Sequence, residues 1–190
     1  MMQNNFANLR RKLLKKIIII IIIGIMGVII IKSNILPRIY PKEYSEYVEK
    51  YSKENNLDPL WIYSIIKAES NFRVDAKSTS NAIGLMQIML STAQEIGTDF
   101  QNDEITEEKL YDAELNIQIG TAYFRSLMDK YNNVNLALIA YNAGMGNLDN
   151  WLEQGIIDKQ GENIDNIPYA ETRNYVKRII QNYKVYNEIY

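Results

Sequence analysis

A run of fifteen residues without a polar side chain constrains this 190-residue chain more than any other feature. Residues 17–31 consist only of Ile, Val, Met and Gly. A helix in the core of a soluble domain is seldom apolar all round, because one face normally meets water. At about 1.5 Å per residue this run spans roughly 22 Å, and Leu13 and Leu14 extend it toward the ~30 Å hydrocarbon core of a bilayer. The tract therefore predicts a transmembrane anchor over residues 13–31.

Charge around the tract predicts its orientation. Residues 1–31 carry five basic side chains and no acidic one. Basic residues favour the cytoplasmic side, so we expect residues 1–12 in the cytoplasm and the remainder outside, on a single-pass protein of the cell membrane. A cleaved signal peptide is the alternative, but the residues after the tract lack the small-x-small pattern that cleavage prefers. Residues 32–39, which contain Pro37, are predicted to be a linker to a domain over residues 40–190.

Beyond the linker, apolar residues recur at helical spacing. Asp58 and Pro59 form an N-cap followed by proline at the first helical position, which marks the start of a helix. No run alternates with period two, and no Asn-Gly or Asp-Gly hairpin turn occurs. The sequence therefore predicts an all-α domain behind one N-terminal transmembrane helix. Its expected helices cover residues 41–54, 59–69, 112–131 and 135–142, with a last helix beginning near Asn166 or Pro168.

Composition excludes several function classes for this domain. Residues 32–190 hold 16 Lys and Arg against 23 Asp and Glu, a net charge of −7, which argues against a nucleic-acid partner. The chain has no His and no Cys, so thiol nucleophiles, Ser–His–Asp triads and zinc sites built on these residues are excluded. No metal site and no cofactor are expected. Proton transfer near neutral pH must then rely on carboxylates, Lys or Tyr.

Glu69 is the carboxylate in the most unusual setting. It ends the apolar segment PLWIYSIIKA of residues 59–68. Desolvation and the negative end of a helix both disfavour an ionised carboxylate, so its pKa should be raised. A carboxylic acid that stays protonated near neutral pH is what glycoside cleavage requires. The alternative is an ordinary surface ion pair with Lys67 or Arg73.

The segment NAIGLMQIM, residues 81–89, is the second candidate. Gly84 permits a positive φ or a close approach of the backbone to a ligand. Gln87 offers a donor and an acceptor beside apolar Leu85 and Met86. By itself this segment is equally typical of a helix start.

Two further segments carry polar and aromatic side chains together. In LIAYNAGMGN, Tyr141 and Asn142 place an aromatic platform beside an amide, which suits an N-acetylated sugar, although the glycines also fit a helix C-cap. In IPYAETRNYVKR, Glu171 and Tyr175 share one helix face at spacing i, i+4. Each pattern alone is also compatible with an ordinary structural role.

In this order, the four motifs resemble the soluble lytic transglycosylase family over roughly residues 43–188. The motifs are Glu69-Ser70, Gly84–Gln87, Ala140–Gly144 and Pro168–Tyr175. The resemblance implies a lysozyme-like α-helical fold, no cofactor, and action on the glycan strands of peptidoglycan. One departure is Met145, where many members have proline.

The resemblance also implies roles for individual residues. Glu69 would be the single catalytic acid and base. It would protonate the oxygen between N-acetylmuramic acid and N-acetylglucosamine and then deprotonate the 6-hydroxyl, giving a 1,6-anhydro end without water. The residues expected to bind substrate are Ser70, Gly84, Leu85, Met86, Gln87, Tyr141 and Asn142, with Glu171 and Tyr175 near the catalytic centre.

Other functions stay open at this level. A hydrolytic muramidase of goose-type lysozyme character would need a carboxylate that activates water, for which Asp75, Asp99 and Asp103 are candidates. A non-catalytic glycan-binding module on a membrane stalk would not need Glu69. A role within an envelope or secretion complex is compatible with an enzymatic one.

Overall fold

The computed structural model of the protein describes residues 2–97 and 105–190, with side chains from residue 13 onward. It consists of an N-terminal helical unit that ends at Pro41 and a compact unit that spans Lys42–Glu188.

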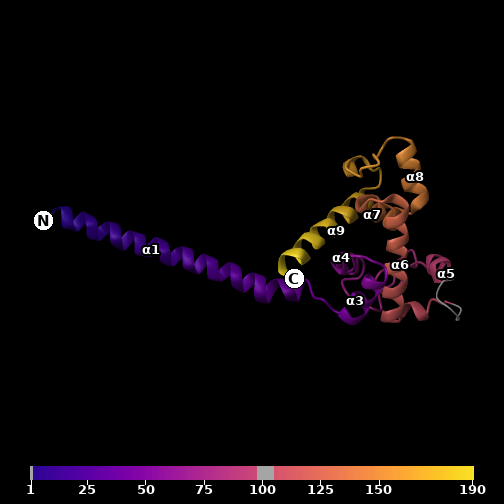
Figure 1. Ribbon diagram of the computed structural model, residues 1–190, viewed down its shortest axis with the longest axis horizontal. Coiled ribbons are helices and arrows are strands. Elements are labelled where there is room, and N and C mark those ends of the chain that lie inside the picture. The colour runs from indigo at the N-terminus through magenta and orange to yellow at the C-terminus, as the bar shows by residue number, and fades with distance from the viewer. Residues whose placement is uncertain (1, 98–104) are drawn as a thin grey trace. The chain divides into compact units, whose positions relative to one another are not determined.

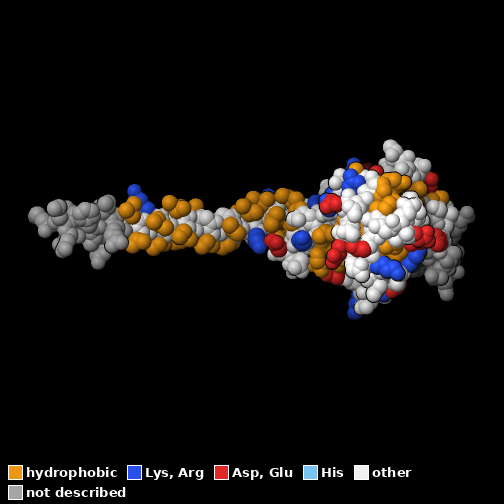
Figure 2. Space-filling view, turned by 90° about the horizontal axis from the view of Figure 1, so that it is seen from above, with side chains coloured by type: hydrophobic (Ala, Val, Ile, Leu, Met, Phe, Trp, Pro, Cys, Tyr) orange, Lys and Arg blue, Asp and Glu red, His pale blue; other side chains and the backbone are white. Residues whose placement is uncertain are grey.

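The N-terminal unit is helical almost throughout. Helix α1 (Met2–Ile30) passes into a π-helical turn, η1 (Ile31–Ile35), and then into α2 (Leu36–Ile39). The stretch Leu13–Ile39 is long and apolar enough to cross a membrane, and none of its most apolar window is buried within the protein. Figure 2 shows hydrophobic side chains along the visible face of this stretch, and the large apolar side chains of residues 13–31 are exposed. Its surface is that of a helix suited to lipid.

Residues 32–39, the predicted linker, are helical and continue directly from α1. Pro37 falls in the first turn of α2. The π-helical turn just before it absorbs the change in hydrogen-bonding pattern. Ser33 Oγ and Asn34 Nδ2 donate to the carbonyls of Ile29 and Ile30, at 2.8 and 3.4 Å. Both are bonds from a side chain to a backbone carbonyl one turn earlier in the same helix.

The compact unit is built from helices, which confirms the expected all-α fold. Within residues 42–97 and 105–190 no strand forms, and only isolated bridges join Lys77 to Ile83 and Ile83 to Ile88. Its elements are α3 (Ser45–Glu54), α4 (Pro59–Glu69), α5 (Leu90–Gly97), η2 (Lys109–Tyr111), α6 (Ala113–Tyr131), α7 (Val134–Ala143), α8 (Met145–Glu153), η3 (Ile164–Asn166) and α9 (Ala170–Ile189).

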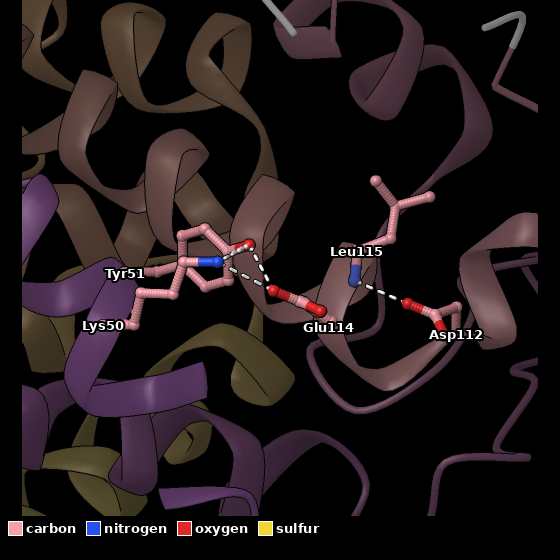
Figure 3. Close-up of polar contacts among 5 residues, drawn as sticks. All are labelled: Lys50, Tyr51, Asp112, Glu114 and Leu115. Carbon is pink, nitrogen blue, oxygen red and sulfur yellow. Dashed lines mark hydrogen bonds and ion pairs between the residues drawn. The ribbon is translucent and has the colours of Figure 1, made fainter. Parts of the chain in front are cut away.

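Helix α6 is central to this unit. It packs against α3, α5 and α7 (Figure 1). Asp112 caps its N-terminus by accepting a hydrogen bond from the N–H of Leu115 at 2.8 Å (Figure 3). In its first turn, Glu114 Oε1 accepts from Lys50 Nζ and Tyr51 Oη of α3, both at 2.8 Å. The same turn therefore starts α6 and fixes it to α3.

Helix α9 runs alongside α4 in the opposite direction. At one end Tyr183 Oη donates to Asp58 Oδ2 at 2.6 Å, and its ring stacks on Trp61 with centroids 3.9 Å apart. Asn182 Nδ2 donates to the carbonyl of Ser64 at 3.3 Å. Asp58 also caps α4 as predicted, accepting from the N–H of Leu60. One aspartate thus starts α4 and holds α9 against it.

Local signals predicted some helices and missed others. The helices expected at 59–69, 112–131 and 135–142 are confirmed. The last helix begins at Ala170, later than expected, after the short turn η3. Helices α5 and α8 were not predicted. The first is only 8 residues long, and the second follows Gly144 directly and buries only Leu148 and Trp151.

Candidate active site

Glu69 is the last residue of α4 and lies partly buried. Tyr175 Oη, from α9, donates a hydrogen bond to Glu69 Oε1 at 2.6 Å. The Tyr175 side chain is itself buried, with 2% of its surface exposed. The two residues that the sequence placed in separate motifs, 106 positions apart, therefore meet in the structure.

The simple ion-pair alternative for Glu69 is not what the structure shows. Lys67 Nζ donates to Asn71 Oδ1 at 3.0 Å, and Arg73 Nε donates to the carbonyl of Ser70 at 3.1 Å. Among the described hydrogen bonds, the Glu69 carboxylate accepts from the neutral phenol of Tyr175 and from neither of these cations.

Burial raises the pKa of Glu69 to about 7. The hydrogen bond from Tyr175 and the positive charge of Arg178 favour the ionised form and act against this rise, while the negative charge of Glu171 adds to it. Desolvation is the largest of these effects. Near neutral pH this carboxyl group is therefore able both to give and to take a proton.

Two tyrosines near Glu69, the buried Tyr175 and the partly buried Tyr141, stay neutral. Burial raises the pKa of Tyr141 and of Tyr175 well above the usual value, and the negative charge of Glu69 adds to both shifts. Both phenols therefore act as hydrogen-bond donors. Tyr175 donates to Glu69, and Tyr141 Oη donates to the carbonyl of Met86 at 2.8 Å.

The segment around Gly84 is a turn and not a helix start. Gly84 has φ +77° and Gln87 has φ 50°. Reciprocal backbone hydrogen bonds join Ile83 and Ile88 at 3.0 and 2.9 Å, and the N–H of Gly84 donates to the carbonyl of Ala76 at 2.8 Å. Helix α5 begins only after this turn closes.

Asn116 on α6, which the sequence analysis did not single out, holds this turn in place. Its side chain is fully buried; Oδ1 accepts from the N–H of Met86 at 2.8 Å. Its Nδ2 donates to the carbonyls of Ile83 and Leu110, both at 2.9 Å. A Cβ on Gly84 would lie 2.7 Å from the Leu110 carbonyl oxygen and collide with Asn116. The sequence did offer a signal for Asn116, because it is an amide side chain on an otherwise apolar face of the predicted helix 112–131.

Several residues expected to bind substrate have buried side chains. Ser70, Leu85 and Met86 expose 2% of their surface or less. Ser70 Oγ donates to the carbonyl of Leu85 at 2.8 Å. Together with the bond from Tyr141 to Met86, this contact ties the turn to the end of α4 and to α7. These three side chains pack inside the protein, where they contact the turn and its neighbours.

Replacing Asn116 by Ala should lower the free energy of unfolding by about 3 kcal/mol, because three buried backbone groups each lose a hydrogen bond, although the carbonyl of Ile83 keeps the one from the N–H of Ile88. Urea unfolding of the full-length chain in detergent measures this. The control is Asn174→Ala, at an exposed position of α9, which should change stability by no more than about 0.5 kcal/mol. Equal losses in both variants would show that Asn116 does not hold the turn.

The loop that follows Glu69 has strained backbone. Asn71, Phe72, Asn81 and Gln87 are non-glycine residues with φ between 50° and 65°. This region is uncommon for residues with a Cβ and most unfavourable for a bulky one such as Phe72, which is buried. Such conformations persist only where the surrounding packing imposes them, and they gather at functional sites.

A cavity of about 240 Å³ opens at the meeting point of this turn with α6 and α7. Tyr141 forms part of its wall and is backed by the rings of Tyr123 and Phe124, with centroids 5.2 and 6.3 Å away. The cavity combines an aromatic wall with amide groups, which suits a sugar ring with polar substituents. Its lining includes Gln87, Met89, Thr92, Tyr123, Tyr141 and Asn142.

Of the remaining acidic candidates, Glu171 and Asp75 lie within the described residues. Glu171 is exposed and acts on Glu69 through its charge. Asp75 is also exposed, while Asp99 and Asp103 lie outside the described residues. Within the described part of the chain, no cluster of three or more acidic side chains could hold a metal ion.

Comparison with known proteins matches this geometry to one family. The model of the transglycosylase SLT domain matches residues 46–163. The soluble lytic murein transglycosylase of Salmonella typhimurium is 34% identical over 145 residues, which cover 74% of this chain and 22% of that protein. The membrane-bound lytic murein transglycosylase C of Edwardsiella ictaluri is 28% identical over an alignment of 210 residues, which covers 98% of this chain and 58% of that protein.

Solved structures show the same fold. An inactive mutant of the lytic transglycosylase Slt from Pseudomonas aeruginosa, with glutamine in place of a glutamate, superposes with a TM-score of 0.71 at 31% identity, covering 78% of this chain and 24% of that one. This confirms the expected lysozyme-like helical fold. The chain spans about a quarter of the length of the soluble relatives that it matches.

Proposed function

The chain belongs to the transglycosylase SLT family, and from this we propose that it is a peptidoglycan lytic transglycosylase with Glu69 as its single catalytic acid and base. The observation that carries the proposal is the setting of Glu69, a carboxyl group whose pKa burial raises to about 7 and whose Oε1 accepts a hydrogen bond from Tyr175. Its relatives are named as lytic murein transglycosylases, soluble or membrane-bound.

The first step is protonation of the bond to be broken. Tyr175 occupies Glu69 Oε1 as a donor, so the transferable proton belongs on Oε2. Oε2–H gives this proton to the oxygen between N-acetylmuramic acid and N-acetylglucosamine. The C1–O bond breaks, and the acetamido group of the muramic acid stabilises the developing positive charge at C1. Glu69 is left ionised, a form that the Tyr175 hydrogen bond and the charge of Arg178 stabilise.

The second step closes a ring on the same sugar. Ionised Glu69 takes the proton of the 6-hydroxyl, whose oxygen bonds to C1 and forms the 1,6-anhydro ring. Glu69 thereby regains its proton, and no water is consumed. The hydroxyl is held in the same molecule as C1, and good orientation of this kind can be worth several kcal/mol over a bulk water.

Product analysis tests this function. Digestion of purified peptidoglycan by the full-length chain in detergent should release muropeptides that end in 1,6-anhydro-N-acetylmuramic acid. Such ends lack one water and resist borohydride reduction, and mass spectrometry detects both properties. Products with mostly reducible muramic acid ends would identify a hydrolytic muramidase instead, and a carboxylate that activates water would then be required.

The proposal extends to the membrane. The exposed apolar helix and the membrane-bound relatives support an uncleaved anchor over residues 13–31, with the catalytic unit outside the cytoplasm. The π-turn and α2 would then lie at the outer interface. An anchor of this kind would also keep the enzyme beside an envelope or secretion complex, which co-purification with the full-length chain would detect.

Fractionation tests the anchor. The full-length protein should pellet with membranes, resist carbonate extraction and keep its original N-terminus. Carbonate releases peripheral proteins but not a spanning helix, because the apolar surface of the helix stays in lipid. A mature N-terminus anywhere within residues 33–45 would show that the tract is a cleaved signal peptide.

A further inference from the structure

Thr172 binds the side chain of Asn142. Thr172 Oγ1, on α9, donates to Asn142 Oδ1, on α7, at 2.7 Å. Thr172 is buried, with 2% of its surface exposed, whereas Asn142 is half-buried and lines the cavity beside Tyr141. Because Oδ1 already accepts this bond, the amide group with two donor hydrogens, Nδ2, is the end of Asn142 that serves the cavity.

This contact departs from the usual behaviour of a helical threonine. A buried threonine hydroxyl in a helix commonly donates to a backbone carbonyl one turn earlier in the same helix. Thr172 instead donates to a side chain of another helix. Thr172 and Tyr175 are spaced i, i+3 and so share one face of α9. That face binds Asn142 through one residue and Glu69 through the other.

From this geometry we infer that Thr172 is a positioning residue, which fixes Asn142 as a hydrogen-bond donor toward the sugar. The cavity then selects a saccharide that presents a carbonyl oxygen at this point, such as a ring with an acetamido substituent. The inference rests on the proposed function, since it assigns the ligand of that same site. Neither Thr172 nor α9 lies within the region that the family model matches, residues 46–163.

The orientation of Asn142 can be measured without any substrate. The full-length chain, labelled with ¹⁵N-asparagine in detergent micelles, gives one side-chain amide signal pair per asparagine, and Asn142→Asp identifies the pair of Asn142. Thr172→Val keeps the shape of the side chain but removes the hydroxyl, so this pair should shift. Thr172→Ser restores the hydroxyl and should return the pair to its wild-type position.

Thr121→Val is the matched control. Thr121 is also buried on a helix, but its Oγ1 has no hydrogen-bond partner within the described residues. The same chemical change there should leave the Asn142 pair unmoved. The inference would be overturned if the amide signals of Asn142 kept their chemical shifts in Thr172→Val, or if they shifted equally in the Thr121→Val control.

Cleavage kinetics then test the consequence for substrate. Thr172→Val should lower kcat/KM on peptidoglycan about tenfold, mainly through KM, while Thr172→Ser and Thr121→Val stay close to wild type. In an Asn142→Ala background the further loss from Thr172→Val should vanish, because Thr172 acts through Asn142. Additive losses would overturn the inference. A wild-type protein that cleaves no peptidoglycan, yet shows the amide shift, would remove the proposed function and leave the positioning role intact.

Discussion

A Glu69→Gln variant is expected to cleave peptidoglycan about a hundredfold to ten-thousandfold more slowly than the wild-type protein, the range typical of a lost general acid. Glutamine keeps the shape of the side chain and can still accept the hydrogen bond from Tyr175 at Oε1. What it lacks is the transferable proton. The measurement is the rate at which the full-length protein clears a cell-wall suspension at pH 6.5.

Glu171→Gln is the matched control, because it makes the same chemical change close to the same site. Glu171 is exposed and acts on Glu69 through its charge. Its replacement should therefore reduce the rate far less. Equal losses in the two variants would mean that the catalytic roles are assigned the wrong way round, and a Glu69→Gln protein of near wild-type rate would end the assignment.

The Glu69→Gln variant should be more stable than the wild-type protein at neutral and alkaline pH. The pKa of Glu69 is raised in the folded state, so the wild-type protein loses stability as pH rises through about 7. Below the ordinary pKa of a glutamate both forms are neutral, and the two proteins should unfold alike. The advantage of Glu69→Gln should appear between about pH 5 and 7 and then level off, at no more than about 3 kcal/mol.

The second large effect is on the pH dependence of cleavage. Only protonated Glu69 can give a proton, so kcat/KM should fall about tenfold for each pH unit above the pKa of Glu69, which burial raises to about 7. From pH 7, where about half of the Glu69 groups are protonated, to pH 9 the expected loss is about fiftyfold. Initial rates on a soluble peptidoglycan fragment, measured in buffers of constant ionic strength, give this profile.

Tyr175→Phe should move the falling limb of this profile to higher pH. The hydroxyl stabilises the ionised carboxylate, and its removal raises the pKa of Glu69 further. Tyr183→Phe is the control, because Tyr183 is on the same helix but binds Asp58 at the far end of α4. A limb that stays in place in Tyr175→Phe, or that moves in both variants, would contradict the role given to Tyr175.

How far the sequence could predict this protein depended on the range of the interaction. Asp58 and Pro59 act within a few residues of themselves, so the cap and the helix that they start could be predicted. The π-turn could not, because Pro37 is equally typical of a linker and of the first turn of a helix.

In the candidate active site, too, the sequence predicted local features but not long-range contacts. The unusual setting of Glu69 at the end of an apolar helix was visible in the sequence, and its proposed role came from the resemblance of four motifs. Its contact with Tyr175 joins residues 106 positions apart, for which no local pattern exists. Asn116 was overlooked for a related reason, since it acts by holding a residue of another motif, and Thr172, although it lies within the fourth motif, binds a residue 30 positions away.

The position of Tyr175 and Thr172 on α9 also bears on when the protein becomes active. Helix α9 follows every other described helix in the chain, so during synthesis Glu69 is made long before the hydroxyl that binds it. A growing chain, or one nicked before residue 170, would carry the acid without its phenol and Asn142 without its hydroxyl partner. The pH profile and substrate affinity of the complete site are therefore expected only after α9 has docked onto α4.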